Sequence, residues 1–210
     1  MTETITAKKL VRHLQDLPAA RHLVALAGPP ASGKSTLAKA LAEQLNQTHP
    51  KRAAIIPMDG FHYDDAVLKA RGHGARKGAP HTFDVGGFAH LLGRLKANTA
   101  PEVAIPLFDR ELEVARAGAA IIAQDVELLL VEGNYLLLDR APWDQLATCF
   151  DLTVMIDVSE AELRRRLSQR WVDLGYDVDA VALKVEENDL PNGQEVLHHS
   201  RAARFLIASE

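Results

Sequence analysis

Short unbroken apolar runs alternate along the chain with segments in which apolar residues recur every three or four positions. The runs lie at His22–Ala27, Ala53–Met58, Glu127–Glu132 and Leu152–Val158. A run of this length is typical of a strand that is buried on both faces of a parallel sheet. Helical spacing follows the first run at Leu37–Leu45. The pattern therefore predicts an α/β fold with a mostly parallel central sheet flanked by helices.

An amphipathic segment precedes the first buried run. Residues from about 4 to 17 place Leu10, Leu14 and Leu17 on one helical face, and Pro18 stands beyond the expected end. Because this helix comes before the strand–helix alternation begins, we expect residues 1–20 to be an N-terminal helical addition that packs on the outside of the fold.

Two further helices carry cap signals at their starts. Asp84 is expected to cap a helix that runs to about Lys96. Ser159, with Glu162 at the capping-box position, is expected to begin a helix rich in arginine. A final helix is predicted over roughly Asp179–Asn188. The remaining apolar stretches predict strands at Val103–Phe108, Ala119–Ala123 and Arg204–Ala208.

The character of the chain changes after the second buried run. Residues 60–79 contain four glycines and a basic cluster of Arg71, Arg76 and Lys77, with a short helix expected near Asp64–Ala70. We call residues of about 60–83 the excursion and expect it to lie over the site on the substrate side. The basic cluster would suit an anionic acceptor, a carboxylate or phosphate, but a solvated loop is the favoured interpretation.

Composition narrows the range of functions. The 210 residues suffice for one sizeable core, and the net charge of −4 gives no basic field that would favour a nucleic-acid partner. The single cysteine, Cys149, cannot form an internal disulfide. The polar opening residues and the lack of any long apolar run lead us to expect a soluble cytoplasmic protein without a membrane partner; a homodimer remains open.

The stretch Gly28–Thr36 matches the phosphate-binding template G-x-x-x-x-G-K-[ST] and lies between a strand and a helix, as that motif requires. Its glycines allow the loop to turn backbone amides toward one point, which with the helix N-terminus makes an anion site. Lys34 is expected to reach the β- and γ-phosphates of ATP, and Ser35 to bind Mg²⁺. The expected nucleotide-binding residues are Gly28, Ala31, Ser32, Gly33, Lys34, Ser35 and Thr36.

Acidic and basic residues near the predicted strand ends indicate the chemistry. Glu132 ends a buried run and is placed to hold Mg²⁺, directly or through water. Asp59 ends the neighbouring run and is the best-placed general base for an acceptor hydroxyl, although an Asp-Gly turn is the simpler interpretation. Arg166 and Arg170 share one helical face and are expected to neutralise the transferring phosphoryl group, whereas Arg164 and Arg165 should point elsewhere.

These motifs together resemble the superfamily of P-loop kinases that contains uridine kinase, pantothenate kinase and phosphoribulokinase, and in particular small bacterial proteins proposed as fructose-transport-system kinases. The resemblance rests on the P-loop followed, in order, by Pro57–His62, Pro80–Asp84, Ile105–Arg110 and Val131–Asn134. It spans residues 23 to about 206 and implies a three-layer P-loop NTPase sandwich with a small lid. Residues 1–210 would then form a single kinase domain, with the arginine-bearing lid at about 160–178.

The resemblance also implies roles for individual positions. Asp59 inherits the role of general base. On the acceptor side, the matching segments assign His62, Phe83, Asp84, Phe108 and Arg110. Tyrosine stands in uridine kinases where this chain has His62, and their pyrimidine-reading residues have no clear counterpart here, so the acceptor is open among a sugar, a nucleoside and a pantothenate-like acid.

The leading hypothesis is thus an ATP- and Mg²⁺-dependent kinase that phosphorylates an alcohol group of a small molecule. Two alternatives belong to other classes. A GTPase-type switch would need an Asn-Lys-x-Asp stretch, which the chain does not contain. A non-catalytic ATP-binding regulator would not need Asp59, Glu132 and the arginine helix together.

Overall fold

The central sheet of the computed structural model, which describes residues 1–209, has six strands in the order β1-β8-β7-β2-β6-β3. Every neighbouring pair runs parallel. The strands are β1 (Glu3–Thr4), β2 (His22–Ala27), β3 (Ala53–Pro57), β6 (Leu128–Gly133), β7 (Leu152–Asp157) and β8 (Phe205–Ala208). The carboxyl ends of all six therefore meet at one edge, where ligands bind in open α/β sheets.

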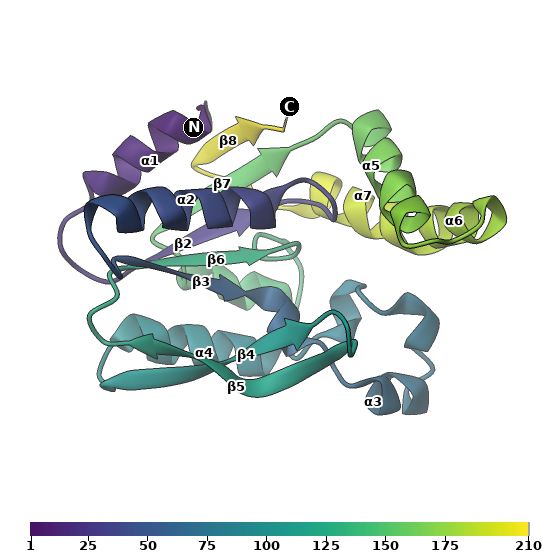
Figure 1. The fold of residues 1–210 in the computed structure, drawn as a ribbon, viewed down its shortest axis with the longest axis horizontal. Helices are drawn as coiled ribbons and strands as arrows, with labels where there is room; N and C mark the ends of the chain where they lie inside the picture. The colour runs from purple at the N-terminus through teal and green to yellow at the C-terminus, as the bar shows by residue number, and fades with distance from the viewer. Residues whose placement is uncertain (210) are drawn as a thin grey trace.

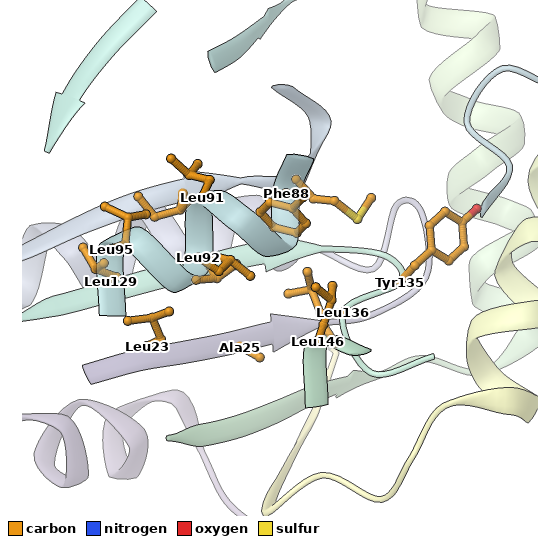
Figure 2. Close-up of a cluster of buried hydrophobic side chains, with 14 of the residues drawn as sticks. Leu23, Ala25, Phe88, Leu91, Leu92, Leu95, Leu129, Tyr135, Leu136 and Leu146 are labelled. Carbon is orange, nitrogen blue, oxygen red and sulfur yellow. The ribbon is translucent and has the colours of Figure 1, made fainter. Parts of the chain in front are cut away.

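Helices cover both faces of this sheet (Figure 1). One face carries α1 (Ala7–Gln15) and α2 (Lys34–Thr48), whose Leu10, Leu14 and Leu41 are buried against the strands. The other face carries α4 (Val85–Ala97) and the 3-10 turns of Trp143–Thr148. In Figure 2 the apolar side of α4 faces β2 and β6, through Phe88, Leu91, Leu92 and Leu95 against Leu23, Ala25 and Leu129.

Two largely helical segments lie beyond the carboxyl edge of the sheet. The excursion contains α3 (Asp65–Ala70) and lies below that edge in Figure 1. The second segment runs through α5 (Glu160–Asp173), α6 (Val178–Lys184), a π-helical stretch at Val185–Asp189 and α7 (Leu190–His199). Its own small core includes Leu163, Leu167 and Val185, and the P-loop residue Ala31 packs against it. This segment is therefore in direct contact with the P-loop.

Strands β4 (Glu102–Asp109) and β5 (Val114–Ala123) form a separate antiparallel hairpin. The hairpin packs against the 3-10 turn Met58–Phe61 that follows β3. This contact is close at Gly60, where a Cβ atom would come within 2.4 Å of the carbonyl oxygen of Pro106. Because Gly60 has no side chain, the hairpin can pack directly against its backbone, next to Asp59.

The structure confirms the predicted fold class and most elements. The predicted strand at His22–Ala27 has the same bounds in the structure. The first helix is shorter than predicted, because residues 3–4 form an edge strand that pairs with β8, and Leu17 lies beyond the helix end. Met58 does not belong to β3, because the chain turns there into the 3-10 turn.

The prediction for the last helix was wrong. The chain does not leave the helix near Asn188 but passes through the π-helical stretch into α7, which ends at His199. Pro191 lies in the first turn of α7, where its missing amide hydrogen costs little. Among residues 1–209, no helix has the length and apolar character that a bilayer crossing requires.

We expect Gly60→Ala to destabilise the protein by about 1–3 kcal/mol, because the added methyl group would force the hairpin away from the turn. Urea denaturation would measure the loss. Gly93→Ala is the matched control: it lies on α4 with no atom within 4 Å of the added Cβ, and the change should stabilise by about 0.5–1 kcal/mol through helix propensity. Equal stability of the two variants would contradict this account of the hairpin contact.

Candidate active site

Three neighbouring strand ends bring the predicted site residues together. The P-loop follows β2, Glu132 lies near the end of β6, and Asp59 follows β3. Because β6 pairs with both β2 and β3, Glu132 stands between the P-loop and Asp59. The sheet order therefore places the nucleotide-binding loop and the candidate base on the same edge.

The P-loop has the backbone conformation that an anion cradle needs. Gly33 has φ of 91° and Ala31 has φ of 60°, so the chain takes left-handed turns before α2 begins at Lys34. Gly28 has no room for a side chain, since a Cβ atom would lie 2.7 Å from Oγ of Ser32. That hydroxyl is buried without a hydrogen-bond partner within the described chain. The loop thus combines the unpaired Ser32 hydroxyl with the N-terminus of α2, which is suited to bind an anion.

Lys34 and Glu132 carry opposite charges at the edge of the sheet, where Lys34 is half-buried and Glu132 is buried. Burial lowers the pKa of Lys34, while Glu132 and Asp59 oppose that shift. Burial likewise raises the pKa of Glu132, while Lys34 opposes that shift. Each group is costly to desolvate alone, so each supports the charged form of the other. The pairing of β6 with both β2 and β3 places these two groups and Asp59 at the same edge of the sheet.

Ser35 and Glu132 fit a magnesium site. The Ser35 hydroxyl donates to Oε2 of Glu132 across 2.9 Å, which brings a hydroxyl and a carboxylate oxygen to one point. Mg²⁺ at a nucleotide site usually takes only one or two protein oxygens, because phosphates and waters supply the rest. Elsewhere in residues 1–209, no group of three His, Cys, Asp or Glu side chains could hold a metal. Thr36 is exposed beside this pair.

Asp59 forms an ion pair with Arg110 from the end of the hairpin. Nη2 of Arg110 lies 2.7 Å from Oδ2 of Asp59. Three positions after Asp59, the Nδ1 atom of His62 lies 2.8 Å from the Asp59 carbonyl oxygen. A carbonyl oxygen can only accept, so Nδ1 carries the hydrogen. Burial lowers the pKa of His62, and the neutral ring then offers Nε2 as an acceptor.

The other predicted acceptor-side residues surround His62. Its ring lies 4.0 Å from that of Phe83 and 4.9 Å from that of Phe108. Phe83 is buried, and its ring packs against that of His62. Asp84 is exposed but is already engaged as the N-cap of α4, where Oδ1 accepts from the Gly87 amide. The structure thus gathers His62, Phe108 and Arg110 around Asp59 and leaves Asp84 in a capping role.

The arginine helix faces the hairpin across a cleft of about 510 Å³. Arg166 and Arg170 both line it, as their spacing predicted. Arg165 also lines it, contrary to the expectation that it points elsewhere, because it and Arg166 both bind the carboxylate of Glu162. The Glu162 carboxylate therefore holds these two arginines. The Ser159 hydroxyl accepts a hydrogen bond from the Glu162 amide, as expected for the predicted helix cap.

One residue at the end of the chain joins the arginine helix to the P-loop. Nη1 of Arg166 donates to Oγ of Ser209 across 2.6 Å, and that hydroxyl donates to the Ser32 carbonyl oxygen across 3.0 Å. Sequence reasoning missed Ser209, since a serine after the last strand carries no local signal. Only the parallel pairing of β8 with β7 brings it to the carboxyl edge.

The basic cluster of the excursion is occupied by contacts within the chain. Arg71 stacks on the Tyr63 ring at 4.4 Å. Arg76 donates to the Glu187 carbonyl oxygen and to Oδ1 of the buried Asn192. Lys77 pairs with Asp65 at 2.7 Å and with Glu113. These cations bind the excursion to the helices and the hairpin.

Acid is expected to weaken the native state through His62. Its pKa in the folded protein lies below its ordinary value of 6.5, chiefly because of burial. As the pH falls below that value, the unfolded chain takes up a proton that the native ring does not, so stability falls with pH. We expect the loss of unfolding free energy between about pH 7 and about pH 5.5 to be smaller in His62→Phe than in the wild type. Urea titrations at both pH values would measure it, and an equal loss in both proteins would contradict the assignment.

Comparison with known proteins agrees with this arrangement. The phosphoribulokinase/uridine kinase family matches residues 23–195. The uncharacterized protein YggC of Escherichia coli is 35% identical over 192 residues, which cover 90% of this chain and 78% of YggC. A proposed uridine kinase of Schizosaccharomyces pombe is 34% identical, covering 89% of this chain and 80% of that protein.

A solved structure is similar over almost the whole chain. It is that of a proposed fructose transport system kinase from Silicibacter, with a TM-score of 0.88 and 40% identity over 96% of this chain and 98% of that one. A pantothenate kinase of Parvibaculum lavamentivorans is 31% identical, and this chain spans about half of its length (53%). The chain therefore belongs to the phosphoribulokinase/uridine kinase family of P-loop phosphotransferases.

Proposed function

We propose that the protein transfers the γ-phosphoryl group of ATP to a hydroxyl group of a small metabolite. The observation that carries the proposal is the sheet order, in which the P-loop after β2, Glu132 on β6 and Asp59 after β3 stand side by side at one edge. A hydroxyl beside Asp59 would thereby lie next to the end of the polyphosphate chain. Family membership supports a kinase, and the relatives' names extend from uridine to pantothenate.

The nucleotide side of the mechanism uses the P-loop. Amides between Gly28 and Ser35 would bind the phosphate oxygens at the start of α2, and the ammonium group of Lys34 would reach the β- and γ-phosphates. Mg²⁺, when bound, would neutralise charge between those phosphates. Ser35 and Glu132 would hold it, since their oxygens already meet there.

The acceptor side uses Asp59 as general base. As the acceptor oxygen forms its bond to the γ-phosphorus, the bond from that phosphorus to the β,γ-bridging oxygen breaks and leaves its electrons on ADP. The proton of the acceptor hydroxyl passes to a carboxylate oxygen of Asp59. The neutral His62 beside it would orient the acceptor through Nε2, and the buried Phe83 would hold that ring in place.

The arginine helix would stabilise the charge that spreads over the transferring group. Arg166 and Arg170 line the cleft between the helix and the hairpin. Arg166 is also joined to the P-loop through Ser209, so a shift of the helix would move both together. Closure of this segment over the excursion would exclude water, which otherwise competes with the acceptor.

We expect Asp59→Asn to fold and to bind ATP but to lose turnover by about 10²–10⁴-fold, because the amide cannot accept the proton. A coupled assay for ADP, run with a panel of sugars, nucleosides and hydroxy acids, would measure turnover. Calorimetric titration with ATP and Mg²⁺ would serve as the binding control. Turnover at the wild-type rate would remove Asp59 from the mechanism.

A further inference from the structure

The cleft beside the candidate base is rich in arginine. Its lining comes from two elements, the hairpin turn and the arginine helix, and comprises Arg110, Glu113, Arg165, Arg166, Gln169, Arg170, Asp173 and Leu174. Both acids have partners of their own, since Glu113 binds Lys77 and Asp173 accepts from Gln169. The lining has four arginines against two acids, so its charge is mainly positive.

Arg110 occupies a particular place among these arginines. It is the cleft arginine that comes from the acceptor-side hairpin, and its partner is Asp59 itself. Its side chain is 63% exposed, whereas that of Asp59 is 26% exposed. An exposed ion pair of this kind is weak and screened by salt, so a competing anion can take the guanidinium group away.

The paired state does not suit a general base. While Asp59 accepts from Arg110, its Oδ2 atom is engaged by the guanidinium group and is not available to an acceptor hydroxyl. A neutral acceptor would have to bind beside this pair and break it without replacing the lost charge. An acceptor with a carboxylate or phosphate group could bind Arg110 through a bidentate contact and leave Asp59 for the hydroxyl.

The other acceptor-side cations are less suited to this role. Arg71, Arg76 and Lys77 are each committed to contacts that hold the excursion, and the Lys77 side chain is only 21% exposed. Lys77 and Arg110 lie on the Phe108 ring at 5.3 and 6.0 Å from its centre. The ring keeps Arg110 close to the acceptor position when the ion pair opens.

We propose that Arg110 is the anion receptor of the acceptor subsite, and that the acceptor is a hydroxy compound bearing a carboxylate or phosphate group. Binding of that group draws Arg110 from Asp59 and so frees the base only when the correct acceptor is present. The proposal rests on the proposed kinase function, which it deepens by naming the class of substrate.

Calorimetry with matched pairs of probes tests the proposal. The pairs are D-gluconate with D-glucose, D-glycerate with glycerol, and D-ribose 5-phosphate with D-ribose, each titrated in the presence of Mg²⁺ and a non-hydrolysable ATP analogue. We expect an anionic member to bind at least about tenfold more tightly than its neutral partner, since the bidentate charged contact is lost in the latter. Arg110→Gln should abolish this difference.

Arg116→Gln is the matched control, because Arg116 lies on the same hairpin, is 57% exposed and pairs with Asp109 outside the cleft lining. It should retain the preference within about twofold. The proposal is overturned if a neutral member binds as tightly as its partner, if no anionic member binds, or if Arg110→Gln keeps the preference. It is also overturned if Arg110→Gln weakens the ATP analogue itself by tenfold, because Arg110 would then serve the nucleotide.

An assay of ADP release separates this proposal from the kinase function. Tight binding of an anionic probe that depends on Arg110, without release of ADP from ATP, would support the receptor and count against the kinase. Phosphorylation of a neutral probe at an undiminished rate would support the kinase and overturn the receptor.

Discussion

The structure depends on holding unlike charges together where they are poorly solvated. Burial disfavours the charged forms of Lys34 and Glu132 at the edge of the sheet, and each charge offsets part of that cost for the other. The hydroxyl of Ser35 satisfies one oxygen of that carboxylate. An arrangement of this kind needs rigid support, and the parallel pairing of β2 with β6 supplies it. The charges are thereby set in place before any ligand arrives, which is the condition for electrostatic stabilisation of a transition state.

The same constraint explains why the acceptor side is built from close backbone contacts. In the proposed mechanism, Asp59 must reach the end of the polyphosphate from a strand that does not pair directly with the P-loop strand. Gly60 lets the hairpin approach the turn after β3, and Gly133 lets Met58 pack where a Cβ atom would lie within 2.5 Å. These two glycines fix the position of the turn that carries Asp59. The hairpin in turn delivers Arg110 to the carboxylate.

Local patterns in the sequence carried most of the fold and the nucleotide half of the site. Apolar runs located the strands, and the P-loop is a contiguous stretch whose conformation follows from its glycines. The acceptor half depends on contacts between distant segments, which no local pattern encodes: the pairing of Arg110 with Asp59 and the link through Ser209 join residues 51 and 177 positions apart, respectively. The family resemblance named Arg110, but only the fold shows what it contacts. The contacts of the basic cluster at Arg71–Lys77 also have no local signal, because Arg76 donates to Glu187 and Asn192 on distant elements.

Hydrogen bonds connect the excursion to the helical segment that carries the arginines. Arg76 of the excursion donates to Glu187 and Asn192, and Asn188 donates back to the Lys77 carbonyl oxygen. Both asparagines lie at or next to the π-helical stretch, whose wider turn changes the direction in which side chains project relative to an α-helix. The Tyr135 hydroxyl, which points toward the excursion in Figure 2, donates to the Gly78 carbonyl oxygen and fixes the loop from the core. The excursion is therefore tied at one side to the rigid sheet and at the other to the segment that carries Arg166 and Arg170. In the proposed mechanism, this hydrogen-bonded path is the physical connection between the acceptor position and the arginines on the phosphate side.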